Sequence, residues 1–248
     1  MKILAIDTSG KQAGAAIVDE YITIGEILIN AQSGPKSWHH SEILMPSIER
    51  LFSLSGLTVQ DMDYVAYTSG PGSFTGIRIG ASTALGLARS INRPWVAVPT
   101  LDALAYNVLY ISEGTLVVPL LDARRGQVYG AVYVKEPSGK LTRLTDYFAS
   151  EINEALEKAA TICNGGNLTP AAEYDQQLIF LGDGADANKL TIQDKYPAAS
   201  FAPANANRQR PASVALCAMD QLKTKVNDKT VKMIYVRDPQ AVRSLKKT

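Results

Sequence analysis

The sequence has little of the residues on which many sites and compartments depend. Its 248 residues include two cysteines, Cys163 and Cys217, and two histidines, His39 and His40. Two cysteines this far apart exclude a disulfide framework and a cysteine-based zinc motif. No apolar run reaches the length of a transmembrane helix, and Asp7 interrupts the first one too soon for a signal peptide. We therefore expect a cytoplasmic protein that makes no membrane contact.

A strong overall charge is also lacking. The 25 Lys and Arg residues nearly balance the 24 Asp and Glu residues, so no global field attracts nucleic acid. Residues 221–248 are the exception, because eight Lys and Arg stand there against two Asp. A solvated tail and a strip that faces RNA both remain open for this basic end.

The most informative segment contains a strand, a glycine-rich loop and a helix. We expect a buried strand at Tyr64–Thr68 and a tight loop over residues 69–75. Two glycines in this loop open backbone angles that other residues avoid. Thr75 is expected to cap the helix, because its hydroxyl can accept a hydrogen bond from the first unpaired N–H groups.

The helix after this loop has one small face. Gly76, Gly80 and Ala84 recur every four residues and line one side, so another backbone can come very close. The loop precedes a helix N-terminus, where a partial positive charge favours anions. A ligand-binding role and a purely structural strand–turn–helix corner both remain open.

The loop lacks the spacing of three enzyme motifs. A phosphate-binding P-loop needs Gly-x-x-x-x-Gly-Lys-Ser/Thr, and no glycine pair here has that spacing. A hydrolase nucleophile elbow needs Gly-x-Ser-x-Gly, but Phe74 stands at the centre of the Gly72–Gly76 segment. A dinucleotide fingerprint needs an acidic residue about 20 positions further on, where Asn92 and Arg93 stand.

The order of elements is repeated in the two halves of the chain. Residues 3–18 and 116–134 each give an apolar strand that ends in Asp, a short polar turn and a second strand entered through glycine. A third strand and a helix follow in both halves, which indicates a duplicated βββα unit. The expected strands are 2–8, 14–19, 21–30, 64–68, 95–98, 116–122, 130–134, 141–148, 178–181 and 233–236, and the expected helices are 40–54, 76–90, 100–110, 151–160, 211–223 and 239–247. Residues 163–176 are expected to form a loose insertion.

Two such halves resemble the α/β fold shared by actin-like proteins, sugar kinases and Hsp70 ATPases (ASKHA). The resemblance implies an N-terminal lobe at 1–105, a C-terminal lobe at 106–210, and a segment 211–248 that packs back on the N-terminal lobe. In that fold the Asp-containing first turn of each half faces a nucleotide. The positions that match are Asp7, Thr8, Ser9, Gly10, Asp122 and Arg124. A turn cap at Asp7 and a surface ion-pair cluster around Asp122 remain alternatives.

Four segments together resemble the bacterial TsaB family, also called YeaZ: residues 3–9, 40–46, 69–80 and 121–125. The resemblance implies a non-catalytic, dimerising subunit of the machinery that makes threonylcarbamoyladenosine in tRNA. Such a subunit binds and stabilises the catalytic paralogue TsaD, helps recruit the ATPase TsaE, and forms a homodimer when alone. Contact with tRNA in the complex stays open. No catalytic residue and no tightly bound cofactor are expected, and ATP or ADP with magnesium at the partner interface stays open.

A metal site is not expected. TsaD binds a metal through a His-x-x-x-His pair, and the matching region here is residues 98–105, with Thr100 and Leu104 at the two positions. Leu cannot ligate a metal and Thr is a poor ligand. The same absence argues against a metallopeptidase.

The resemblance implies that helices 40–54 and 76–90 from two molecules pair in a four-helix seam. The expected interface residues are His40, Leu44, Ile48, Leu51, Ser73, Phe74, Gly76, Ile77, Gly80 and Ala84. The alternative is that both helices simply cover the sheet of their own lobe. For function, the alternative class is a free-standing ATP-dependent phosphotransferase of the sugar-kinase superfold.

Overall fold

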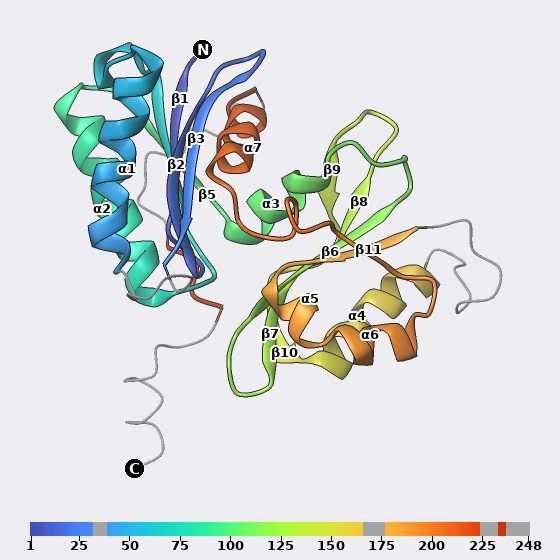
Figure 1. Ribbon diagram of the computed structural model, residues 1–248. Coiled ribbons are helices and arrows are strands. Elements are labelled where there is room, and N and C mark those ends of the chain that lie inside the picture. The colour runs from blue at the N-terminus through green and yellow to red at the C-terminus, as the bar shows by residue number, and fades with distance from the viewer. Residues whose placement is uncertain (32–38, 166–176, 224–232, 237–248) are drawn as a thin grey trace. The chain divides into compact units, whose positions relative to one another are not determined.

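Two mixed β-sheets with the same strand order form the framework of the chain. The computed structural model describes residues 1–31, 39–165, 177–223 and 233–236. These residues form two compact units (Figure 1). The first unit contains residues 1–103 and 209–235, and the second contains residues 104–208 with Val236.

The first unit is a five-stranded sheet covered by helices on both faces. Its strands are β1 (Ile3–Asp7), β2 (Gln12–Val18), β3 (Thr23–Asn30), β4 (Tyr64–Thr68) and β5 (Trp95–Val98), in the order β3-β2-β1-β4-β5. Strands β1, β4 and β5 are parallel, and β2 and β3 are antiparallel to their neighbours. Helices α1 (His40–Ser55) and α2 (Phe74–Ser90) lie on one face and α7 (Pro211–Lys223) on the other (Figure 1). Every residue of β1 is therefore buried, as its unbroken apolar run predicts.

The second unit repeats this order with an insertion. Its strands are β6 (Leu116–Asp122), β7 (Gln127–Gly130), β8 (Tyr133–Lys135), β9 (Leu141–Arg143), β10 (Phe148–Glu151), β11 (Leu178–Leu181) and β12 (Ser200–Phe201), and its main sheet path is β10-β7-β6-β11-β12. Its helices are α4 (Ile152–Gly165), α5 (Asp183–Ala187) and α6 (Lys189–Lys195). As in the first sheet, three strands are parallel and the next two antiparallel. The predicted duplicated ASKHA fold is confirmed.

Some of the predicted boundaries of helices and strands are wrong. The predicted helix 100–110 is α3 (Thr100–Ala105) followed by a 3-10 turn, η2 (Tyr106–Val108); another 3-10 turn, η1 (Val59–Asp61), follows α1. The predicted strand 141–148 is split, because β9 forms an inserted hairpin with β8 while β10 pairs with β7. Residues 233–236 are not a strand. Residues 166–176 of the predicted insertion and the predicted helix 239–247 lie outside the described residues.

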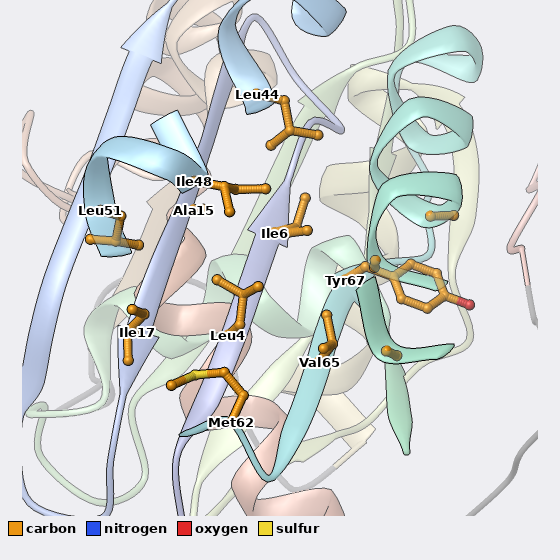
Figure 2. Close-up of a cluster of buried hydrophobic side chains, with 13 residues drawn as sticks. Leu4, Ile6, Ala15, Ile17, Leu44, Ile48, Leu51, Met62, Val65 and Tyr67 are labelled. Carbon is orange, nitrogen blue, oxygen red and sulfur yellow. The ribbon is translucent and has the colours of Figure 1, made fainter. Parts of the chain in front are cut away.

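The core of the first unit lies between its sheet and the α1–α2 pair (Figure 2). Leu44, Ile48 and Leu51 project from α1 onto the strands, where they meet Ile6 and Ile17 among others. On the α2 side the largest buried ring, that of Tyr67, packs in the same cluster as three helix residues without bulk, Ala81, Ala84 and Ala88. Small residues on α2 thus make room for a large one on β4. None of the helices in the described ranges has both the length and the apolar character that a membrane span needs.

A partly buried acidic side chain fixes α7 to the edge strand of this sheet. Glu26 on β3 accepts hydrogen bonds from Arg210 Nε at 3.1 Å and from the N–H of Ala212 at 3.0 Å, and it also pairs with Arg210 Nη2. Ala212 lies in the first turn of α7, where unpaired N–H groups favour a carboxylate. Glu26 therefore caps α7 and neutralises Arg210 at once.

We expect Glu26→Ala to lower the free energy of unfolding by about 1–3 kcal/mol, because it leaves Arg210 and an α7 N–H group without their partner. Urea unfolding measures the loss. Glu49→Ala removes an exposed carboxylate from α1 and is the matched control, with an expected change within about 0.5 kcal/mol. Equal effects of the two substitutions would contradict the capping role of Glu26.

Candidate functional site

The glycine-rich loop and the turn after β1 form one hydrogen-bonded corner. We use "the corner" for residues 7–10, residues 69–75 and the first two turns of α2. Ser73 donates its N–H to the carbonyl of Ser9 at 2.7 Å, and Thr8 donates its hydroxyl to the carbonyl of Gly76 at 2.7 Å. The N–H of Thr100 reaches the carbonyl of Gly70 at 2.8 Å. The loop is therefore fastened to the ends of β1 and β5 by main-chain groups.

Glycine is required in the corner because two backbones touch there. A Cβ atom on Gly72 would overlap the carbonyl of Ser9, and one on Gly76 would overlap the carbonyl of Thr8. A Cβ on Gly80 would meet the Thr8 hydroxyl. The small face of α2 thus receives the turn of its own lobe, and a partner seam at Gly76 and Gly80 stays a prediction.

Most of the other expected interface residues lie in the core of the lobe. The side chains that are 3% exposed or less are Leu44, Ile48, Leu51, Ile77 and Ala84. The reason is the apolar face of the sheet, which α1 and α2 must cover before any partner is present. This placement matches the alternative that both helices cover the sheet of their own lobe, and a partner contact through these five residues stays a prediction. Ser73 and Phe74 are exposed, as an interface requires.

His40 is intermediate in exposure between the buried interface candidates and the exposed Ser73 and Phe74. It is half-buried at the start of α1, and burial lowers the pKa of its imidazole despite a hydrogen bond with the backbone of Gly10. A Cβ on Gly76 would lie 2.9 Å from its Nδ1 atom. His40 therefore packs the start of α1 against the corner.

The cap of α2 is Ser73 rather than Thr75. The Ser73 hydroxyl accepts a hydrogen bond from the N–H of Gly76 at 3.2 Å, while Thr75 is the exposed second residue of the helix. Helix α2 starts two residues earlier than the glycine spacing predicts, at Phe74. Both Phe74 and Thr75 consequently belong to its outer side.

The outer side of α2 carries a shallow groove. The residues that line it are Phe74, Thr75, Arg78, Ile79, Ser82 and Thr83. The guanidinium of Arg78 stacks 3.8 Å from the centre of the Phe74 ring. No Asp or Glu occurs between Phe74 and Ser90, and Arg78 has no carboxylate partner within the described ranges. This outer side therefore offers apolar and cationic groups. In the sequence, the positions on the side of this helix opposite Gly76, Gly80 and Ala84 indicate this outer side.

Asp7 is a buried carboxyl at the base of the corner. Its Oδ1 atom accepts hydrogen bonds from the N–H and the hydroxyl of Ser9, at 2.8 and 2.7 Å, and from the hydroxyl of Thr68 at 3.2 Å. Its Oδ2 atom is buried without a hydrogen-bond partner among the described residues. Burial is the dominant effect and raises the pKa of this carboxyl.

The turn that contains Asp7 is closely packed by other parts of its own lobe. Thr8 and Ser9 are buried with Asp7, and a Cβ on Gly10 would lie 2.7 Å from the side chain of Gln209. Loop 69–75 and Gln209 thus occupy the space next to the turn. A phosphate group would need that space, and a role for Asp7, Thr8, Ser9 and Gly10 toward nucleotide stays a prediction.

The matching turn of the second lobe is exposed but acidic. Asp122 donates its N–H to the Asp183 carboxylate at 2.9 Å, and the N–H of Arg124 donates to the Asp122 carboxylate at 2.7 Å. Arg124, Arg125 and Gly126 all have positive φ angles, between 57° and 74°. Arg124 is exposed, yet a phosphate beside it would also meet two carboxylates. A role for Asp122 and Arg124 toward nucleotide stays a prediction.

The positions that correspond to the histidine pair of the resemblance lie on α3. Thr100 begins this helix and Leu104 follows one turn later, and both are buried. Within the parts of the chain that the structure describes, no group of three or more His, Cys, Asp or Glu is placed to hold a metal. The complete burial of Thr100 and Leu104 suits a role in packing.

Comparisons with known proteins give relatives in the biosynthesis of threonylcarbamoyladenosine on tRNA. The family model "TsaD: tRNA N6-adenosine threonylcarbamoyltransferase" matches residues 34–244. The TsaB protein of Bacillus subtilis is 30% identical over 222 residues, which cover 89% of this chain and 88% of that protein. The TsaB protein of Escherichia coli is 34% identical over 139 residues, 56% of this chain and 58% of that protein.

Solved structures agree on the fold. The structure of YeaZ from Pseudomonas aeruginosa matches with a TM-score of 0.70 at 19% identity, covering 94% of this chain and 99% of the other. A second Pseudomonas aeruginosa structure, described as similar to peptidase YeaZ, matches with a TM-score of 0.71 at 20% identity, over 95% and 99% of the two chains. At these identities the likeness concerns the fold alone.

We expect Gly76→Ala to destabilise the first lobe by about 1–3 kcal/mol, because the new methyl group forces the α2 backbone away from the Thr8 carbonyl. Gly86→Ala is the matched control on the same helix. A Cβ there meets no atom within 4 Å, so the substitution should stabilise by about 0.5–1 kcal/mol. Chemical denaturation of both variants measures the difference, and two shifts of the same sign would contradict the close backbone contact.

We expect the stability of Asp7→Asn relative to the parent to rise with pH. The raised pKa of Asp7 favours folding at low pH, and that contribution is lost as pH increases from about 3.8 through the folded pKa. Asn cannot ionise, so the variant escapes a loss of about 1.4 kcal/mol per unit of raised pKa. Urea unfolding between pH 4 and 8 checks this sign. A difference that does not vary with pH would contradict it.

Proposed function

This chain belongs to the TsaB (YeaZ) family, and on that premise we propose that it is a non-catalytic subunit in the biosynthesis of threonylcarbamoyladenosine on tRNA. Its work is to bind and stabilise a TsaD-like catalytic paralogue and to help recruit a TsaE-like ATPase. In the absence of that paralogue, the same surface pairs with a second copy of the chain.

The observation that carries the proposal is the match to Bacillus subtilis TsaB over nearly the full length of both chains. A tRNA N6-adenosine threonylcarbamoyltransferase of Wolbachia is also similar, at 29% identity over 194 residues, 73% of this chain and 56% of that protein. What distinguishes this chain is α3, where Thr100 and Leu104 stand at the positions that the resemblance gives to metal-binding histidines. Neither provides an imidazole, which supports a partner role rather than a catalytic one.

The outer side of the α1–α2 pair is the surface that we assign to the partner. On α2 it comprises the groove with Phe74, Arg78 and Ile79, and on α1 it adds the half-exposed Met45, which lies away from the buried face of that helix. Exposed apolar side chains flanked by arginine are typical of protein interfaces. A stable contact buries at least about 1,000 Å² in total, which needs both helices. Homodimer and heterodimer would compete for this surface.

Any nucleotide is assigned to the complex rather than to this subunit alone. The turn at Asp7 is filled by the loop and by Gln209, and the turn at Asp122 is acidic. We therefore propose that ATP or ADP with magnesium binds where the chain meets its partners, and that tRNA contacts the assembly as a whole.

One feature favours the alternative of a free-standing phosphotransferase, namely the unpaired Oδ2 atom of Asp7. A buried carboxyl of this kind costs stability, which is common at functional sites. ATP-dependent product formation by the isolated chain, abolished in Asp7→Ala, would favour this alternative over the subunit role.

The direct experiment is a tRNA modification assay reconstituted with the catalytic paralogue, the ATPase and this chain. We expect modification to require all three proteins, and co-purification to show a stable pair of this chain with the paralogue. Full activity in the mixture that omits this chain would overturn the subunit role.

We expect Ser82→Arg to weaken pairing with the paralogue at least tenfold, because it places a long charged side chain in the groove of α2 without touching the core. Calorimetric titration measures the affinity. Gln193→Arg makes the same change at an exposed position of α6 in the second lobe and should bind like the parent. The surface would be misassigned if Ser82→Arg paired normally.

A further inference from the structure

A segment far along the chain returns to the corner of the first lobe. Met233–Tyr235, which we call the C-terminal strap, lies against the loop after β4. The N–H of Ile234 donates to the carbonyl of Ser69 at 2.7 Å, and a Cβ on Gly70 would lie 2.5 Å from the carbonyl of Ile234. Met233 packs against the core cluster beneath α1 and α2. The strap therefore has one main-chain bond and one apolar anchor.

This anchoring places Tyr235 on the outer side of α2. The centres of the Tyr235 and Phe74 rings are 5.5 Å apart at an interplanar angle of 40°, a usual geometry for an aromatic pair. The Tyr235 hydroxyl donates to Met233 Sδ at 3.0 Å. Both rings remain partly open to solvent, with 42% of Tyr235 and 38% of Phe74 exposed. Arg78, Phe74 and Tyr235 form one continuous cluster.

We infer that the C-terminal strap belongs to the partner-binding surface and that Tyr235 is one of its contact residues. This inference rests on the proposed function and extends the surface beyond the two helices. Tyr and Arg are enriched among the residues that dominate binding energies at interfaces. A ring held in place by a neighbouring ring loses little side-chain entropy when a partner covers it.

The chemistry of the cluster defines what the partner presents. Arg78 stacks its face on Phe74, which leaves the edge of the guanidinium free for a bidentate contact with a carboxylate. The partner therefore offers an apolar patch for the two rings and an Asp or Glu for Arg78. A protein fits this description better than RNA does, because one cation in the cluster is too few for phosphate-driven binding.

The test is the affinity of Tyr235 variants of the full-length chain for the TsaD-like paralogue. We expect Tyr235→Ala to raise the Kd about tenfold, and Tyr235→Phe to bind like the parent because it keeps the ring. Tyr21→Ala is the control. It removes a more exposed tyrosine, 89% open, from the turn between β2 and β3, at the opposite end of β1 from the corner.

A double variant tests whether the two rings act as one contact in binding. Because the rings of Phe74 and Tyr235 act together, we expect Phe74→Ala with Tyr235→Ala to cost about 2- to 10-fold less affinity than the product of the single losses. A parent-like affinity of Tyr235→Ala would overturn the inference while leaving the proposed function intact. So would equal losses in Tyr235→Ala and Tyr235→Phe, or a loss confined to tRNA binding. Failure of the parent chain itself to bind the paralogue would instead overturn the proposed function.

Discussion

The contact between the start of α2 and the turn after β1 is the constraint on which the first lobe depends. Ser73 and Thr8 tie the two segments together through carbonyl groups at 2.7 Å, and this closeness excludes a side chain at Gly72 and Gly76. With one side of α2 fixed against β1, the opposite side must face outward. The direction of the partner surface therefore follows from a packing requirement inside the lobe.

Because of this constraint, each of the helices α1 and α2 has an inner side and an outer side with different roles. Their inner sides cover the apolar sheet, and their outer sides remain available for a partner. The buried carboxyl of Asp7 lies at the same junction and holds Ser9 and Thr68 in place at an electrostatic cost. Main-chain hydrogen bonds then join the loop to β5 and to the C-terminal strap. A surface made of α2 and the strap thus inherits its geometry from the corner.

Much of the fold can be predicted from the sequence, but less of the candidate site can. The repeated order of a strand that ends in Asp, a turn, two further strands and a helix, present after Asp7 and Asp122, predicts the duplicated sheets. The insertion of the β8–β9 hairpin could not be predicted, because a strand pattern does not reveal its partner. Likewise, the spacing of Gly76 and Gly80 predicts a small face but not which backbone fills it. The contact of Tyr235 with Phe74 joins positions 161 residues apart, and no local pattern indicates it.

Hydrogen exchange of the first lobe, with and without the TsaD-like paralogue, tests the outward orientation of this surface most directly. We expect the paralogue to slow exchange at the N–H groups of Phe74 and Thr75, which have no intrahelical partner, and along the strap at Met233–Tyr235. The α6 helix of the second lobe should be unchanged. Protection at α6 with none at the start of α2 would contradict a partner surface on the outer side of α2.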